Sequence, residues 1–288
     1  MSASLALVDS AAVGATSAAT VVLINVGTPD APTPSAVRRY LREFLSDPRV
    51  IDLPALGRWL LLNLVILPFR PKKSAALYRG IWTERGSPLL VHSNALAEAL
   101  RVRLPRVRVV LGMRYGAPSL ADALRDALRD ALRDAPGRVV LVPLFPQYAS
   151  ATTGSALAEA YRLLGGAAHV PPVSAVASFF DDAGFVAASV SKIMEVTQAG
   201  VDALVLSYHG VPVSQVQATA APGHTCAGDA GASCCDERGP SNAACYRARP
   251  DVRWVLHSHA PHATGWAVSG QSFFDVPFMG EPVVSLGD

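Results

Sequence analysis

The chain has 288 residues, half of them hydrophobic, and Lys plus Arg exceed Asp plus Glu by only 25 to 23. This composition predicts a folded protein of about two domains. Because its charges nearly balance, the chain has no basic excess with which to hold a nucleic-acid backbone. We therefore expect no nucleic-acid partner.

The first twenty residues contain neither a basic stretch nor a sustained apolar run, both of which an export signal requires. We interpret residues 1–20 as a loose N-terminal leader, and we expect a cytoplasmic protein.

The most apolar segment is WLLLNLVILPF, residues 59–69. Its eleven residues fall short of the roughly twenty needed to cross a bilayer. One interpretation is a core or lid helix. The other is an apolar lip, flanked by Arg58, Arg70, Lys72 and Lys73, that touches a membrane surface or an apolar ligand.

Short runs rich in Val, Leu and Ile recur at residues 21–26, 107–112, 139–144 and 203–206, and each ends in a polar or Gly/Pro-rich turn. Such runs are typical of buried parallel strands. Helical stretches lie between them, the plainest being the triple Asp-Ala-Leu-Arg repeat in residues 119–138. Its leucines at 120, 124, 128 and 132 predict one apolar stripe, Ser119 and Asp122 predict an N-terminal cap, and Pro136-Gly137 ends the helix. We assign this helix a purely structural role.

Strands that alternate with helices predict an α/β fold with an open, doubly wound and mostly parallel sheet. Ligands bind such sheets outside the carboxyl ends of the strands, so we sought the chemistry in the turns that follow them. Those turns contain no phosphate loop, no G-x-G-x-x-G and no G-x-S-x-G pattern. Nucleotide binding and serine hydrolysis are therefore unsupported.

The turns themselves resemble a known family. The segments VVLINVGTPDAPTPSAVRRYLREFLSDPRVIDLP, YRGIWTERGSPLL, GMRYGAPS, PLFPQYASATTGSA and LSYHGVP are similar to the successive motifs of ferrochelatase. The resemblance implies insertion of ferrous iron into protoporphyrin IX or a related porphyrin at the end of haem synthesis. It also implies two Rossmann-like halves that face a cleft. We place the first half at residues 21–168 and the second at residues 169–248.

The same resemblance implies roles for individual residues. His209, in SYHGVP, corresponds to the active-site histidine that removes protons or contacts the iron. The residues implied to border the porphyrin are Arg114, Tyr115, Tyr148, Ser150, Thr152 and Thr153, with Arg114 a candidate partner for a propionate. Structural alternatives remain open: Tyr148 in the core, Arg114 paired with a nearby acid, and the threonines capping the next helix.

All four cysteines, Cys226, Cys234, Cys235 and Cys245, fall in one Gly/Asp-rich segment that we define as the insertion 223–245. It resembles an internal insertion that carries a two-iron two-sulfur cluster in some ferrochelatases. Four thiolates at this spacing could also hold zinc or remain free.

The resemblance ends near residue 248. We interpret residues 249–288 as an aberrant tail, produced by a frame slip or truncation, because the family's expected acidic active-site residue is missing from it. Two interpretations follow: a ferrochelatase, or a non-catalytic remnant that still binds porphyrin. The sequence does not determine the oligomeric state.

Overall fold

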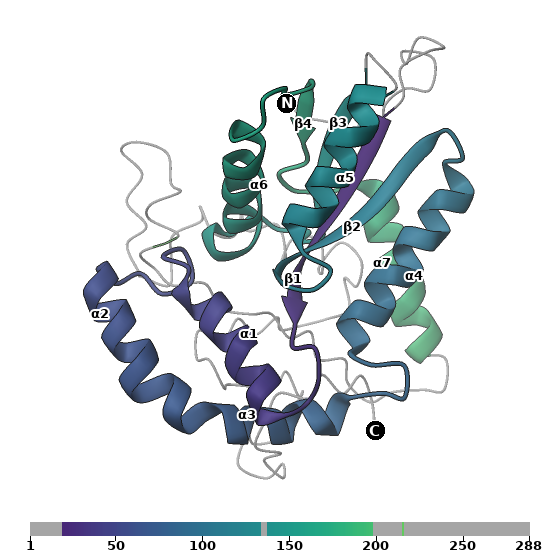
Figure 1. Ribbon diagram of the computed structural model, residues 1–288. Helices are drawn as coiled ribbons and strands as arrows, with labels where there is room; N and C mark the ends of the chain where they lie inside the picture. Colours follow the sequence, from purple (N-terminus) through teal and green to yellow (C-terminus); the bar gives the residue numbers. More distant parts are fainter. Residues whose placement is uncertain (1–18, 134–136, 198–214, 216–288) are drawn as a thin grey trace, which may run out of the picture. The chain divides into compact units, whose positions relative to one another are not determined.

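Four parallel strands form the sheet that the apolar runs predict (Figure 1). A computed structural model describes residues 19–133, 137–197 and 215. The strands are β1 (Ala19–Thr28), β2 (Val107–Gly116), β3 (Arg138–Pro143) and β4 (Val173–Ala175). Their order across the sheet is β2-β1-β3-β4, and every pair is parallel. Three of the four predicted strands are thereby confirmed, and the fourth, at residues 203–206, lies outside the described residues.

Helices cover both faces of this sheet. The helical elements between β1 and β2 are α1 (Pro34–Ser46), α2 (Ala55–Leu60), the π-helix η1 (Leu61–Ile66), α3 (Leu67–Ile81) and α4 (Pro88–Arg103). Those that follow in the same unit are α5 (Leu120–Arg133), the π-helix η2 (Ser150–Gly154) and α6 (Ser155–Gly165), whereas α7 (Ala183–Thr197) belongs to a separate compact unit. Because the strands are buried on both sides, they are apolar throughout instead of alternating.

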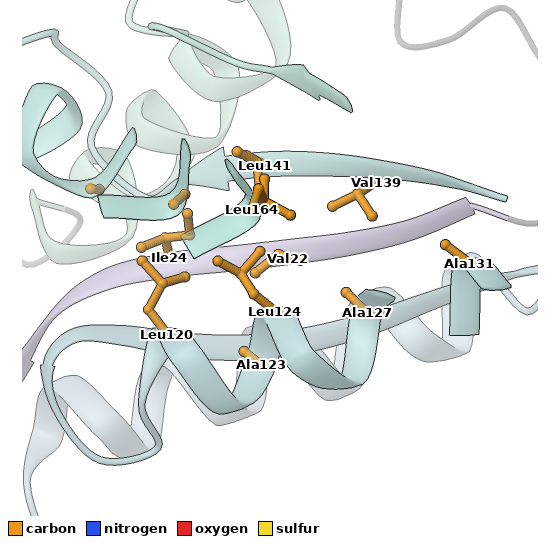
Figure 2. Packing of buried hydrophobic residues seen from close by; sticks show 12 residues of the cluster. Val22, Ile24, Leu120, Ala123, Leu124, Ala127, Ala131, Val139, Leu141 and Leu164 are labelled. Carbon is orange, nitrogen blue, oxygen red and sulfur yellow. The ribbon is translucent and has the colours of Figure 1, made fainter. Parts of the chain in front are cut away.

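Two clusters of buried side chains separate the layers. On one face, Val22, Ile24, Val139 and Leu141 of the strands pack against α5 and α6 (Figure 2). On the other face, Leu23, Val109, Leu111 and Met113 pack against Ala97 of α4. Helix α4, in the connection that leaves β1, therefore covers one face of the sheet. Helix α6, in the connection that leaves β3, covers the other face. This reversal makes the carboxyl ends of β1 and β3 the switch point of a doubly wound sheet.

Helix α5 agrees with its predicted cap but only partly with its predicted stripe. Asp122 donates its backbone N–H to Ser119 Oγ at 3.1 Å, which confirms the cap. Leu120 and Leu124 are buried, whereas Leu132 is 56% exposed. A four-residue repeat overshoots each turn of 3.6 residues by about 40°, so the leucines drift off the sheet. Ala123, Ala127 and Ala131 complete the buried face instead.

The strand ends of β1 and β2 approach each other closely. Gly27 has φ +106°, and a Cβ at this position would lie 1.7 Å from the carbonyl oxygen of Tyr115. Gly116 has φ +83° and faces the carbonyl of Thr28. Only glycine combines this backbone conformation with the absence of a side chain, so both residues are required for the two strands to end side by side.

The chain divides into two compact units, with the break between Ser178 and Phe179. The first unit contains the whole four-stranded sheet. It continues past residue 168, where we placed the boundary between the halves, because β4 pairs with β3. In the second unit the structure describes α7, which begins after Asp182; the Asp182 carboxylate accepts the backbone N–H of Phe185 at 2.9 Å.

Candidate functional site at the strand ends

Helix α1 lies beyond the carboxyl end of β1 (Figure 1). Thr33 caps its first turn, with Oγ1 accepting the backbone N–H of Ala36 at 3.3 Å. Further along the helix, Tyr40 donates its hydroxyl to the carbonyl of Gly27 at 3.2 Å. Glu43 accepts the backbone N–H of Gly116 at 3.0 Å. The helix thus satisfies backbone groups that the sheet itself leaves without partners at its edge.

The residue that ends α1, Asp47, is the centre of a buried polar network. Its Oδ2 accepts hydrogen bonds from Arg114 Nη2 at 2.7 Å, from Tyr115 OH at 2.8 Å and from Ser155 Oγ at 2.5 Å. Its Oδ1 accepts the backbone N–H of Arg49 at 2.7 Å. The side chain of Asp47 is only 5% exposed. This carboxylate therefore joins the end of α1, the end of β2 and the start of α6.

The network keeps its charges in place near neutral pH. Burial raises the pKa of Asp47, but hydrogen bonds from Ser155, Arg49 and Tyr115 and the charge of Arg114 outweigh it, so the pKa lies below its ordinary value. Burial is the largest cause that raises the pKa of Tyr115 above its ordinary value. Asp47 is consequently an anion and Tyr115 a neutral phenol, and neither accepts a proton in this pH range.

Arg114 and Tyr115, two of the predicted porphyrin-lining residues, both belong to this network. Arg114 pairs with Asp47, which confirms the structural alternative that we left open for it. Its guanidinium also lies over the Tyr115 ring, with Cζ 4.4 Å from the ring centroid. Tyr115 is 1% exposed, whereas the Arg114 side chain keeps 17% of its surface. Of the two, Arg114 is the one that can reach a ligand without rearrangement.

The other predicted residues of this edge lie between β3 and α6. Tyr148 is 45% exposed, so it is not a core residue. Ser150 begins η2 and lies 3.1 Å from Arg49 Nη1, which donates to its hydroxyl. Thr152 donates its hydroxyl to the carbonyl of Ala149 at 3.3 Å. Thr153 is fully buried, and its hydroxyl has no hydrogen-bond partner among the described residues.

A second feature of this unit is the segment that we call the lip, residues 55–81, which comprises α2, η1 and α3. Most of its large apolar side chains point outward. The exposed ones are Leu56, Trp59, Leu60, Leu64, Val65, Phe69, Leu77 and Ile81. Leu62 and Leu67 alone among its large apolar side chains are buried. The lip is therefore not a core helix, and none of the described helices has both the length and the apolar character needed to span a membrane.

Several predicted residues cannot be placed. His209 and the cysteines at positions 226, 234, 235 and 245 lie outside the described residues. The described residues contain no cluster of three or more metal-ligating side chains. The predictions for these five residues stay predictions.

Asp47, Ser155 and Arg49 belong to the site although our sequence reasoning named none of them. A signal for Asp47 was present. An acid at the C-terminal end of a helix faces the negative end of the helix dipole, which is unfavourable, so its presence there points to a compensating cation. No comparable signal marked Ser155, since a serine at the start of a helix is ordinary.

An open parallel sheet with a polar network at its strand ends defines an α/β protein of the doubly wound class, which binds its ligands at that edge. The ferrochelatase family model matches residues 18–248. The chain belongs to the ferrochelatase family.

Curated relatives agree with this assignment. The ferrochelatase of Chromobacterium violaceum is 45% identical over 199 residues, covering 67% of this chain and 54% of that protein. That of Teredinibacter turnerae is 42% identical over 205 residues, covering 69% and 55%. That of Klebsiella pneumoniae is 45% identical over 195 residues, covering 67% and 59%. The chain therefore spans little more than half the length of these relatives.

The lowered pKa of Asp47 predicts how stability depends on pH. A group whose pKa is lower in the folded state stabilises the fold above its unfolded pKa, about 3.9 for Asp, and loses that contribution as the pH falls through the folded value. At pH 7 we expect Asp47→Asn to lower the free energy of unfolding by about 3 kcal/mol, because it removes the buried carboxylate that pairs directly with Arg114.

Urea unfolding of both proteins, followed by circular dichroism between pH 7 and pH 3, measures this difference. It should be constant above about pH 5 and shrink below about pH 4. A difference that does not change with pH would show that the Asp47 charge is not involved.

Proposed function

We propose that this chain is a ferrochelatase in activity as well as in family, a metal chelatase of the lyase class that inserts ferrous iron into protoporphyrin IX or a related porphyrin to form haem. The observation that carries this proposal is the match of the family model over residues 18–248, which includes the SYHGVP motif. The curated relatives, all named ferrochelatase, support it. Iron and porphyrin are then the substrates.

His209 is the residue to which we assign the proton chemistry. When iron binds the four porphyrin nitrogens, the two pyrrole N–H groups must each lose a proton. An imidazole with an ordinary pKa of about 6.5 is largely neutral at cellular pH, so it can accept such a proton or contact the metal transiently. We propose that the second Rossmann-like half, which we first placed at residues 169–248, begins after the unit break at Ser178 and carries this histidine.

The unit that contains the four-stranded sheet supplies the residues that we propose bind the porphyrin. Its predicted porphyrin contacts come from the carboxyl end of β2 and from the turn between β3 and α6, the edge at which a doubly wound sheet binds ligands. Arg114 offers a guanidinium to a propionate, and the exposed ring of Tyr148 offers an apolar surface to the macrocycle. Ser150 and Thr152 add hydroxyl groups close to the same turn.

An iron-dependent loss of porphyrin fluorescence tests the activity. The purified chain, kept anaerobic with ferrous ions and protoporphyrin IX, should convert the fluorescent porphyrin to non-fluorescent haem. His209→Ala should lower this rate by about 100-fold or more while leaving porphyrin binding intact, because it removes the proton acceptor. The matched control is His169→Ala, which changes an exposed histidine of the described unit.

Binding of porphyrin by the wild-type chain without turnover would favour the alternative, a non-catalytic porphyrin-binding protein. A failure to bind porphyrin at all would contradict both functions.

We propose in addition that the four cysteines of residues 223–245 hold a two-iron two-sulfur cluster. The donor set suits it, since four thiolates within one segment are the usual ligands of such clusters. Protein purified without oxygen from iron-replete cells should contain two iron and two sulfide per chain and absorb visible light, and Cys234→Ala should reduce both. Zinc in place of iron, or no bound metal, would overturn this assignment.

The lip supports a further part of the proposal, namely peripheral contact of a cytoplasmic protein with a membrane. Trp59 and Phe69 are 57% and 75% exposed, and the basic residues Arg70, Lys72 and Lys73 come immediately after Phe69. An exposed apolar face with basic neighbours is the pattern of segments that lie in the membrane interface and attract anionic headgroups.

Vesicles of phosphatidylcholine and phosphatidylglycerol test this contact by co-sedimentation. The double variant Trp59→Ser, Phe69→Ser should bind at least about tenfold more weakly, because two large apolar side chains no longer enter the bilayer. Val102→Ser is the control, since Val102 is 80% exposed but lies on α4, outside the lip. Equal binding of the lip variant and the control would exclude the lip as the contact.

A further inference from the structure

The guanidinium of Arg114 is held along one edge only. Its Nε donates to Ser155 Oγ at 2.9 Å, and its Nη2 donates to Asp47 Oδ2 at 2.7 Å. Its flat face is covered by the Tyr115 ring. Its Nη1 makes no hydrogen bond with any described residue, and the side chain is 17% exposed. The remaining N–H groups of Arg114 are therefore those on the edge away from Asp47 and Ser155.

Asp47 is in turn fixed more firmly than Arg114. Its side chain is 5% exposed, its Oδ1 is tied to the backbone of Arg49, and its position follows directly from the end of α1. A carboxylate that accepts four hydrogen bonds, one of them from the main chain, has little freedom to move. The orientation of Arg114 is thus determined by Asp47, and not the reverse.

We propose that Asp47 is a positioning residue, which fixes Arg114 so that its Nη1 edge is ready to donate to a carboxylate of the ligand. An arginine side chain otherwise loses considerable rotational freedom when it binds, and fixing it in advance removes that cost from the binding step. Because Asp47 also balances the charge of Arg114, the pair recognises a carboxylate through the geometry of its donors more than through net attraction. The part of this inference that names the ligand, a porphyrin propionate, rests on the proposed function.

The chain contains a matched control for this pair. Arg108 lies on the same strand as Arg114 and pairs with Asp130 of α5, with Nε 2.6 Å from Oδ2. The Asp130 side chain is 8% exposed, close to the value for Asp47. Arg108, however, lies at the opposite end of β2 from the strand ends that form the site. Asp130→Asn therefore removes an equally buried, arginine-paired carboxylate without touching the site.

The first measurement follows Arg114 itself. In side-chain ¹⁵N–¹H spectra of the full chain, the Nε–H signal of Arg114, assigned by its loss in Arg114→Lys, should be shifted and protected from solvent exchange. Asp47→Asn should move it toward the position of free arginines and speed its exchange, whereas Asp130→Asn should leave it unchanged. An unchanged signal in Asp47→Asn would overturn the proposal, whether or not the chain binds porphyrin.

The second measurement is the affinity for protoporphyrin IX and for its dimethyl ester, both in the same detergent. Asp47→Asn should raise the Kd of the free acid about tenfold, which is the cost of immobilising one long side chain, and change that of the ester by less than about twofold. Ser155→Ala, which removes no charge, should raise the Kd of the free acid about threefold. This variant replaces Asp47→Asn in the measurement if Asp47→Asn folds poorly. In an Arg114→Gln background, Asp47→Asn should have no further effect.

Three outcomes of the affinity measurement contradict the inference. If Asp47→Asn changes the Kd no more than Asp130→Asn does, Asp47 has a merely structural role. If affinity for the free acid and for the ester falls equally, the role of Asp47 is unrelated to the carboxylates. If the effects of Asp47→Asn and Arg114→Gln on the Kd are additive, Asp47 does not act through Arg114. A wild-type chain that binds neither porphyrin overturns the proposed function instead, and the spectra of Arg114 then decide the positioning role.

Discussion

A single carboxylate oxygen, Oδ2 of Asp47, accepts hydrogen bonds from β2 and α6, segments that lie more than sixty residues further along the chain. Removing such an oxygen from water is costly unless its partners compensate, so its three donors must be present together. That requirement fixes where α1 ends relative to the strand ends of β1 and β2. The two glycines at those ends, Gly27 and Gly116, allow the backbones of β1 and β2 to lie close together there. With side chains at these two positions the strands could not approach as closely.

The position of α1 has consequences for the segment that follows it. The lip packs against α1 through α3, and among its large apolar side chains only Leu62 and Leu67 are buried. Arg38 of α1 donates to the carbonyl of Leu67, and Leu67 is itself buried, so the lip is anchored at that residue. Its remaining apolar surface faces outward. The same arrangement thus produces a polar site at the strand ends and an apolar surface in the chain segment next to it.

The sequence predicted most of the sheet and less of the site. Continuous apolar runs identified β1, β2 and β3 because strands buried on both faces have no polar alternation. The repeat in α5 gave its cap correctly, yet the orientation of its leucines departed from the strict four-residue pattern, and Asp130 paired with Arg108 of β2. Motif resemblance singled out Arg114 and Tyr115 but not Asp47, which became their partner only through folding. The sequence left two interpretations of residues 59–69, a core or lid helix and an apolar lip, and the exposure of Trp59 and Phe69 excludes only a helix buried in the core.

The sequence by itself determined three of the four strands, helix α5, the parallel character of the sheet and the family, because these depend on local periodicity and on motifs that can be read along the chain. Only the tertiary structure decided which charged groups meet. Asp47 and Arg114 are separated by 67 positions, and no local pattern specifies that they lie 2.7 Å apart. Their contact depends on how α1 crosses the strand ends, and that follows from packing of the whole unit. The sequence suggests that Arg114 binds a ligand, and the pairing with Asp47 fixes the orientation of its guanidinium.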